Sequence, residues 1–245
     1  MKRYIFATFL LIIIPNILFA DHIPFNHPGL IGQDFTVAFQ QDLRIFYKVH
    51  PDIKLLFETQ LKENIHQDSA FNKFPELLTF RVGGLFRLHT NFKVGAYYQL
   101  YNRRNFNTGN LNSEHIPMID LIPRFKLSKF IVFELRLRHE FNFYSDAEQS
   151  RLKTLWYSVK VRPKFTYYVF DEIEFKMATF LAYEIYIPIN YDSTHMEHWI
   201  YYGLTFPLTK EMSLSPYAAM VFHRAVGTLA ASKTLLFGLG LTFDF

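Results

Sequence analysis

The sequence ends in Leu236-Phe-Gly-Leu-Gly-Leu-Thr-Phe-Asp-Phe245, and this stretch decides the fold. Large apolar side chains occupy every second position of its last seven residues, at Leu239, Leu241, Phe243 and Phe245. Glycine, threonine and aspartate fill the positions between them. Because successive side chains of a strand point to opposite faces, this alternation predicts a strand with one apolar face and one small or polar face.

The same alternation is clearest in residues 130–143, where one face is charged. The apolar positions there are Ile131, Phe133, Leu135, Leu137 and Phe141. The positions between them are Val132, Glu134, Arg136, Arg138 and Glu140. This pattern predicts a strand with an aliphatic and aromatic face and an almost wholly ionised face.

Comparable stretches recur along the chain and predict about eleven strands, with short connections alternating with longer polar ones. The predicted strands are residues 35–48, 52–63, 77–89, 91–103, 115–127, 129–143, 151–169, 173–188, 196–206, 212–223 and 233–245. Tight turns are expected at His50–Asp52, Thr90–Asn91, Ser128–Lys129, near Asp171–Glu172 and at Pro207–Glu211. Short turns at one end and longer loops at the other are typical of a transmembrane up-and-down antiparallel β-barrel, although a β-sandwich could show the same alternation.

Bacterial single-chain barrels normally have an even number of strands, so eleven segments leave one strand unassigned. We expect about twelve strands and leave ten open, with residues 21–33 as the candidate for a further strand. Pro24 and Pro28 make that stretch a poor strand.

The first twenty residues predict a cleaved secretory signal peptide. A basic Met1-Lys-Arg3 precedes an apolar stretch from Tyr4 to Ile14, and Ala20 stands before Asp21. The apolar stretch is too short for a spanning helix. The predicted domains are therefore a signal peptide, 1–20, and a single barrel, 21–245.

The composition supports an envelope protein and excludes several function classes. Phe, Tyr and Trp make up 45 of 245 residues, and the chain has no cysteine, which excludes disulfides and thiol chemistry. Without Lys2 and Arg3 the chain has 24 basic and 22 acidic residues, so the mature charge is about +2. Because no basic block or recognition motif is present, no nucleic-acid partner is expected.

Several motifs resemble a known family. The apolar terminal strand ending in Phe245 is similar to the strand by which Gram-negative outer-membrane barrels are recognised by the assembly machinery. The order of Ile122-Pro-Arg-Phe-Lys-Leu-Ser-Lys-Phe130, Leu135-Arg-Leu-Arg-His-Glu140, Arg151-Leu-Lys153 and Ala182-Tyr-Glu-Ile-Tyr186 resembles the outer-membrane barrels of domain-of-unknown-function family twenty-four-ninety. The resemblance implies an outer-membrane location after export and contacts with outer-membrane lipid, but it brings no activity with it.

The charged face is expected to line the lumen of the barrel. The candidate lumen residues are Arg81, Arg87, Asp120, Arg124, Glu134, Arg136, Arg138, Glu140, Lys160, Arg162, Glu174 and Glu184. A turn at Leu127–Lys129 predicts Asp120 opposite Arg136 within a residue or two, and Glu134 near Lys160. Such side chains either fill a narrow lumen as a structural plug or line a path for a solute, and the sequence leaves both open.

Two catalytic or metal-binding alternatives are weaker. His195-Met-Glu-His198 places two histidines and a glutamate close together, but not at the spacing of a helical zinc motif. His139 and His223 could serve a lipid hydrolase if a serine such as Ser145, Ser150 or Ser158 lay beside them. We expect no catalytic residues, no bound metal and no cofactor.

Aromatic residues near the predicted strand ends are expected to form interfacial girdles, or else to stack on sugars in a channel. They are Tyr47, Tyr98, Tyr101, Tyr144, Tyr167, Tyr168, Trp199 and Tyr201. The sequence thus predicts a monomeric, passive outer-membrane barrel, either a narrow solute channel or a structural envelope protein. The alternatives are a lipid-active barrel enzyme and a protein whose loops bind or adhere.

Overall fold

The computed structural model describes residues 35–64, 77–104, 111–145, 155–169, 177–189, 195–225 and 231–245. The regular structure of these residues is all β-strand. In this part of the chain, no helix is long and apolar enough to cross a membrane. The predicted signal peptide, 1–20, and the candidate strand at 21–33 lie outside the described residues.

The described strands number eleven. They are β1 (Phe35–His50), β2 (Ile53–Asn64), β3 (Leu77–His89), β4 (Phe92–Arg104), β5 (Leu111–Lys126), β6 (Ile131–Ser145), β7 (Leu155–Tyr168), β8 (Ala178–Pro188), β9 (His195–Pro207), β10 (Met212–Ala225) and β11 (Ala231–Asp244). Each predicted segment corresponds to one of them, with ends that differ by a few residues.

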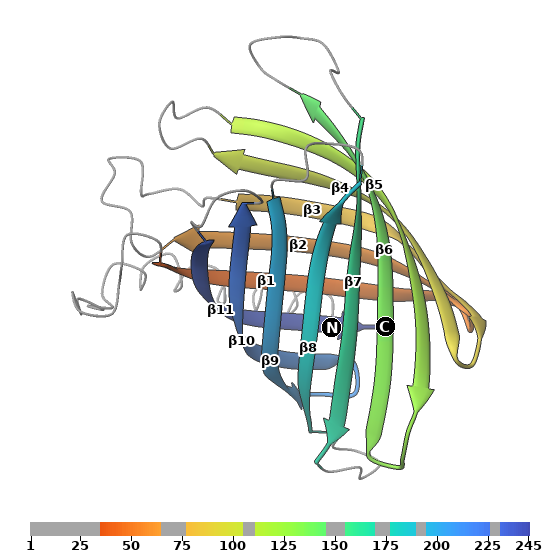
Figure 1. Cartoon of the computed structure of the whole chain (residues 1–245). Helices are drawn as coiled ribbons and strands as arrows, with labels where there is room; N and C mark the ends of the chain where they lie inside the picture. Colours follow the sequence, from red (N-terminus) through yellow and green to blue (C-terminus); the bar gives the residue numbers. More distant parts are fainter. Residues whose placement is uncertain are drawn as a thin grey trace, which may run out of the picture. The chain divides into compact units, whose positions relative to one another are not determined.

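The eleven strands form one closed barrel in which consecutive strands are neighbours (Figure 1). Every consecutive pair is antiparallel, and β1 closes the barrel by pairing with β11 in parallel, from Phe35 opposite Lys233 to Phe46 opposite Asp244. This closure follows from the count, because the first and last of eleven alternating strands run in the same direction. Eleven described strands therefore close the sheet, where the sequence had led us to expect about twelve.

Short connections lie at one end of the barrel. The turns of four hairpins lie there, at residues 51–52, 90–91, 127–130 and 208–211. Phe245 lies at the same end, where it forms backbone hydrogen bonds with Phe46 and Lys48 of β1. The tight turn predicted near Asp171–Glu172 lies outside the described residues.

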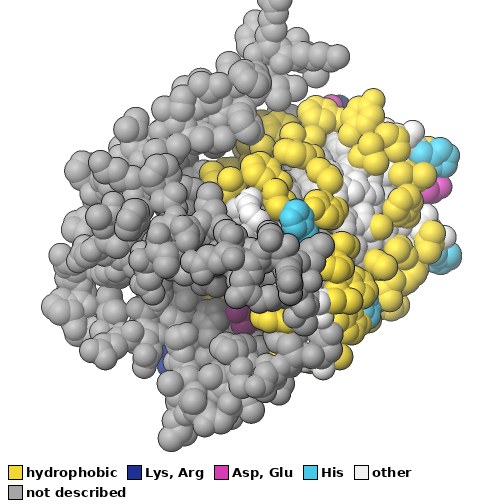
Figure 2. Space-filling view, turned by 90° about the horizontal axis from the view of Figure 1, so that it is seen from above, with side chains coloured by type: hydrophobic (Ala, Val, Ile, Leu, Met, Phe, Trp, Pro, Cys, Tyr) yellow, Lys and Arg dark blue, Asp and Glu magenta, His cyan; other side chains and the backbone are white. Residues whose placement is uncertain are grey.

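The two faces of the barrel differ sharply in polarity. Alternate residues that face outward are almost all apolar, and many are large and exposed, such as Leu181 at 53% and Ile200 at 44%. Figure 2 shows hydrophobic side chains over much of the visible wall of the described residues. Among the outward positions whose side chains the structure describes, only Glu63 and Lys233 are charged. Arg104 and Arg224 also take outward positions in the strand register, and all four residues lie near strand ends opposite the short turns. The barrel is therefore apolar outside and polar inside.

The lumen is partly filled by apolar side chains. Leu56, Tyr97, Ile116 and Met118 form one buried cluster, with Phe46 and Tyr101 packed against it. Ala38, Ala219 and Leu236 form a second, in contact with Trp199, Tyr201 and Tyr217. Inward-facing glycines make room for the larger rings, as expected for a crowded lumen. A Cβ at Gly95 would lie 2.3 Å from the ring of Tyr97, and one at Gly238 would lie 2.0 Å from the ring of Tyr217.

Candidate functional site in the lumen

The candidate site is a cavity of about 350 Å³ inside the barrel. Among the described residues, eight basic side chains line it: Arg44, Lys62, Arg81, Arg136, Arg138, Lys160, Arg162 and Lys164. Five acidic side chains line it as well: Asp42, Glu58, Glu140, Glu184 and Glu197. The described lining therefore has an excess of three positive charges.

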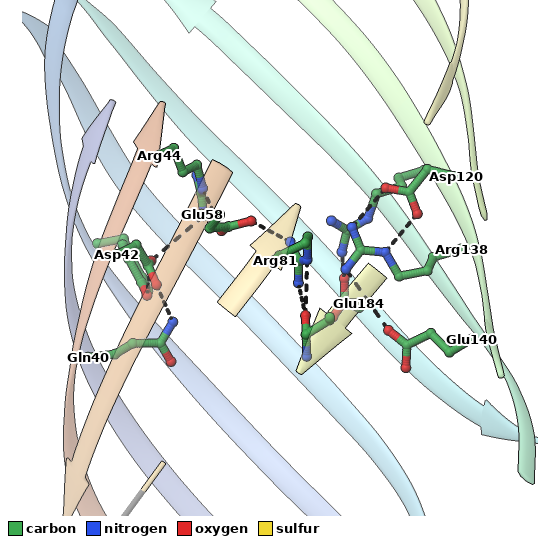
Figure 3. Close-up of polar contacts among 12 residues, drawn as sticks. Gln40, Asp42, Arg44, Glu58, Arg81, Asp120, Arg138, Glu140 and Glu184 are labelled. Carbon is green, nitrogen blue, oxygen red and sulfur yellow. Dashed lines mark hydrogen bonds and ion pairs between the residues drawn. The ribbon is translucent and has the colours of Figure 1, made fainter. Parts of the chain in front are cut away.

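The first polar network runs across β1 to β4. The side chain of Arg44 donates to Glu58 at 2.8 Å, and Arg81 is paired with the other carboxylate oxygen of Glu58 (Figure 3). Arg81 also donates to the side chain of Gln99 at 3.0 Å. Asp42 accepts hydrogen bonds from Gln40 at 2.8 Å and from Tyr217 of β10 at 2.9 Å, which ties the network across the seam between β1 and β11. Alternation of side chains places all of these residues inside the barrel.

The second network joins β5, β6 and β7. Arg138 donates two hydrogen bonds to Asp120, at 2.7 and 2.8 Å, in the bidentate arrangement that guanidinium and carboxylate favour. Asp120 and Arg138 are only 2% and 5% exposed. The carboxylate of Glu140 lies 4.0 Å from the guanidinium group of Arg138 and forms an ion pair with the ammonium group of Lys160 at 3.0 Å. This network is satisfied within itself and holds three strands in register.

A third cluster of charges is less evenly matched. Arg136 of β6 lies opposite Arg162 of β7, and both face the carboxylate of Glu184 on β8. Arg136 is hydrogen-bonded to Glu184, whereas Nε of Arg162 is 3.8 Å from it, beyond hydrogen-bond range. Nε of Arg136 and Nε of Arg162 are buried without a hydrogen-bond partner. Two guanidinium groups thus share one carboxylate, which leaves donors in excess.

Aromatic rings form the wall of the cavity beside this cluster. The rings of Trp199 and Tyr201 on β9 stack with centroids 5.7 Å apart, and Tyr201 is 6.3 Å from the ring of Tyr217. The ammonium group of Lys164 lies 4.5 Å from the centroid of the Phe180 ring, a cation–π distance. The cavity therefore has cations on β6 and β7 and aromatic surface on β8 to β10.

These rings correct part of the predicted interfacial girdle. Tyr47, Tyr98 and Tyr167 are exposed on the outer wall, as expected. The inward-facing members of the predicted set are Tyr101, Tyr168, Trp199 and Tyr201, of which Tyr101, Trp199 and Tyr201 line the cavity. The side chain of Tyr144 lies outside the described residues.

Most of the predicted lumen residues take part in the three clusters. They are Arg81, Asp120, Arg136, Arg138, Glu140, Lys160, Arg162 and Glu184. Arg124 and Glu134 also take inward positions and stand opposite each other in the sheet. Arg87 has inward parity but is half exposed at the short-turn end, where it pairs with Asp52 at 2.7 Å. Glu174 lies outside the described residues.

One predicted pairing falls within its stated range, and the other is wrong. Asp120 is opposite Arg138, two residues from the predicted Arg136, because the β5–β6 connection is centred one residue later than expected. Glu134 is opposite Lys164, and the predicted partner Lys160 is opposite Arg138. A turn whose centre moves by one residue shifts the pairing of its two strands by two, and this keeps the face of each side chain unchanged.

Six charged residues of the cavity are not among the predicted lumen residues: Asp42, Arg44, Glu58, Lys62, Lys164 and Glu197. Gln40, Asp42 and Arg44 do alternate with less polar neighbours, but Gln41 on the outer face blurred that signal. Glu58 shares the polar face of its strand with Lys54, Gln60 and Lys62. Its pairing with both Arg44 and Arg81 depends on strand register, which the sequence does not give.

Some members of the alternative metal and hydrolase sites lie apart, while the side chains of His195, His223 and Ser145, and residue Ser150, lie outside the described residues. Glu197 faces inward and accepts a hydrogen bond from Trp199, whereas His198 faces outward and contacts Tyr183. In the described part of the chain, no group of three or more His, Asp or Glu side chains is placed to hold a metal ion. Ser158 is buried in the lumen, and His139 faces outward toward Tyr157.

Comparisons with known proteins add little to the geometry. No protein-family model matches the chain, and no curated protein matches it. The resemblance to domain-of-unknown-function family twenty-four-ninety therefore stays a prediction. One solved structure, described as "NanC porin structure in rhombohedral crystal form", is similar at a TM-score of 0.48 and 12% identity, over 85% of this chain and 97% of that chain.

Proposed function

We propose that this protein is an outer-membrane β-barrel that forms a narrow, anion-preferring channel. The observation that carries the proposal is the reversed polarity of the barrel: an apolar outer wall around a cavity lined by eight basic and five acidic side chains. An apolar face meets lipid at no cost, while a charged interior needs water or counter-charges.

The outer wall supports the membrane location. A strand that crosses a bilayer needs about 9–11 residues when tilted. The eleven strands contain between 11 and 16 residues, so each is long enough to span. The charged residues at their outward positions are Glu63, Arg104, Arg224 and Lys233, and all four lie near strand ends where lipid head groups would lie.

Three outward-facing histidine–tyrosine pairs support the same location. His139 is 2.6 Å from the hydroxyl of Tyr157, His198 is 2.6 Å from that of Tyr183, and His115 contacts Tyr98. Each pair lies toward the strand ends opposite the short turns. Amphipathic rings with a polar tip favour the membrane–water interface, so the pairs form a belt where an outer interface is expected.

The inner surface favours a channel over a fully closed plug. A plug would pair every charge. Eight basic side chains line the cavity against six acidic ones even when Asp120, the buried partner of Arg138, is counted, and two guanidinium Nε atoms have no hydrogen-bond partner. Fixed positive charge beside a water-filled path lowers the electrostatic cost for an anion and raises it for a cation.

The test is the reversal potential of the purified protein in planar bilayers under a salt gradient. We expect wild-type current to be carried mainly by anions. Lys62→Glu with Lys164→Glu changes the described lining to six basic and seven acidic side chains, so the preference should move toward cations. The matched control is Lys129→Glu with Lys210→Glu, which reverses two exposed charges in the short turns and should leave the reversal potential nearly unchanged. A folded barrel that conducts no current, or a reversal potential that both double variants shift equally, would refute the proposed function.

A further inference from the structure

We propose that the lumen surface formed by Arg136, Arg162, Glu184, Ala182 and Tyr201 is a binding site for a small carboxylate that carries a ring. The proposal rests on the proposed function insofar as the ligand must enter the lumen. It goes further by naming the ligand chemistry and the side chains that bind each part of the ligand.

The cationic half of the site lacks acceptors. A guanidinium group has five N–H donors, and Arg136 and Arg162 face a single carboxylate, that of Glu184. The side chains of Arg136 and Arg162 are 12% and 27% exposed, so water satisfies few of these donors. Leaving a buried donor unpaired is costly. A second carboxylate in the adjoining cavity supplies two acceptor oxygens in the planar arrangement that guanidinium groups bind best.

The sheet register places a small residue beside the two arginines, where that second carboxylate would bind. Ala182 lies between Lys164 on β7 and Tyr201 on β9, in the row next to Glu184. Its methyl group takes up little of the lumen beside the two arginines, and all of these residues line the same cavity. The cavity of about 350 Å³ is at the lower end of the size range of small-molecule sites.

The aromatic half of the site explains why the ligand has a ring. Tyr201 stacks against Trp199 and packs near Tyr217, so its position is fixed from both sides. A flat aromatic surface next to a pair of cations suits a ligand with a ring at one end and a carboxylate at the other. Chloride or acetate would use only the cationic half.

Binding is measured by the fluorescence of Trp199 in the refolded protein in detergent micelles, with Trp156→Phe removing the only other tryptophan. Benzoate is the probe, benzyl alcohol has the ring without the charge, and acetate has the charge without the ring. We expect saturable binding of benzoate at neutral pH, with benzyl alcohol and acetate each at least about tenfold weaker, since each lacks one half of the contacts.

Variants locate the site. Arg162→Gln and Arg136→Gln are each expected to weaken benzoate binding about tenfold, the effect of losing one charged hydrogen bond. Ala182→Leu fills the space beside the arginines and should block benzoate without removing a charge. Arg44→Gln is the matched control, because it removes the same charge from the cavity lining on the β1 side, where Arg44 already has Asp42 and Glu58 as partners.

The outcomes separate this proposal from the channel. Equal affinity for acetate and benzoate would overturn the role of the aromatic wall, and equal losses in Arg44→Gln and Arg162→Gln would overturn a local site. Unchanged benzoate binding in Ala182→Leu would also overturn a local site beside the two arginines. The titration needs no current, so a conducting barrel that does not bind benzoate refutes only the site. A barrel that binds benzoate but does not conduct refutes only the channel. Heat-modifiable migration on gels confirms that each variant is folded.

Discussion

At the scale of single residues, the pair of Arg138 and Asp120 shows how a charge is kept inside this barrel. Both side chains are almost fully buried, and two hydrogen bonds join them at 2.7 and 2.8 Å. A buried pair of this kind is weak evidence for net stabilisation, because desolvation offsets the attraction. Removing only one of the two side chains is different, because the remaining buried charge then has no partner.

Arg138→Met should therefore destabilise the folded barrel by about 3 kcal/mol or more, because Asp120 is left buried and ionised or must take up a proton. The double variant Asp120→Leu with Arg138→Met should recover most of that loss. The measurement is the free energy of unfolding by guanidinium in lipid vesicles, followed by tryptophan fluorescence. A double variant as unstable as Arg138→Met alone would contradict the assignment of the loss to the stranded carboxylate.

At the scale of strands, inward glycines and inward rings are matched across neighbouring strands. A Cβ at Gly238 would lie 2.0 Å from the ring of Tyr217, which is held by its hydrogen bond to Asp42. Gly240, two residues along β11 on the same face, has no such neighbour, and its nearest contact to an added Cβ would be 3.5 Å. The two glycines thus occupy equivalent positions in the same strand, but only Gly240 has room for a Cβ atom.

Gly238→Ala is expected to destabilise the barrel by about 1–3 kcal/mol, the usual cost of overpacking, and Gly240→Ala by much less. Both variants change glycine to alanine in the same strand, so the effect of the backbone cancels in the comparison. Free energies of unfolding in lipid vesicles measure the difference. If Gly238→Ala with Tyr217→Ser did not regain stability relative to Gly238→Ala, crowding by the Tyr217 ring would not be the cause.

The strand scale also shows what the sequence could predict. Alternation placed Arg136, Arg138 and Glu140 on the inner face correctly, because their outward neighbours are uniformly apolar. It did not decide the direction of Trp199 and Tyr201, because aromatic and aliphatic residues occupy both faces of that stretch of β9. Alternation also cannot predict which residues pair across neighbouring strands. Whether Asp120 meets Arg136 or Arg138 depends on a one-residue difference in the position of a turn, and both choices keep the same alternation.

At the scale of the whole barrel, the parallel seam accounts for the odd number of predicted segments. Eleven alternating segments put residues 35–48 in the same direction as the terminal strand, and the expectation of an even count therefore called for one further strand. The sheet closes directly through that arrangement, with Asp42 of β1 opposite Gly240 of β11. Tyr217 reaches across from β10 to Asp42, so polar contacts of the lumen reinforce the seam.

The outer wall gives the most direct test of whether the barrel spans a bilayer. Ile200 lies near the middle of β9 and is 44% exposed, and Leu208 in the adjoining short turn is 51% exposed. In a water-soluble barrel, Arg at either position would change stability by less than about 0.5 kcal/mol, as is usual for exposed sites. In a bilayer, Arg at the midplane costs about 2–4 kcal/mol and Arg near the interface about 0–1 kcal/mol. We therefore expect Ile200→Arg to lower the free energy of unfolding in lipid vesicles by at least about 2 kcal/mol, and Leu208→Arg to leave it nearly unchanged. If both variants changed the free energy of unfolding by equal, small amounts, the apolar wall would not face lipid, and the proposed membrane channel would be refuted.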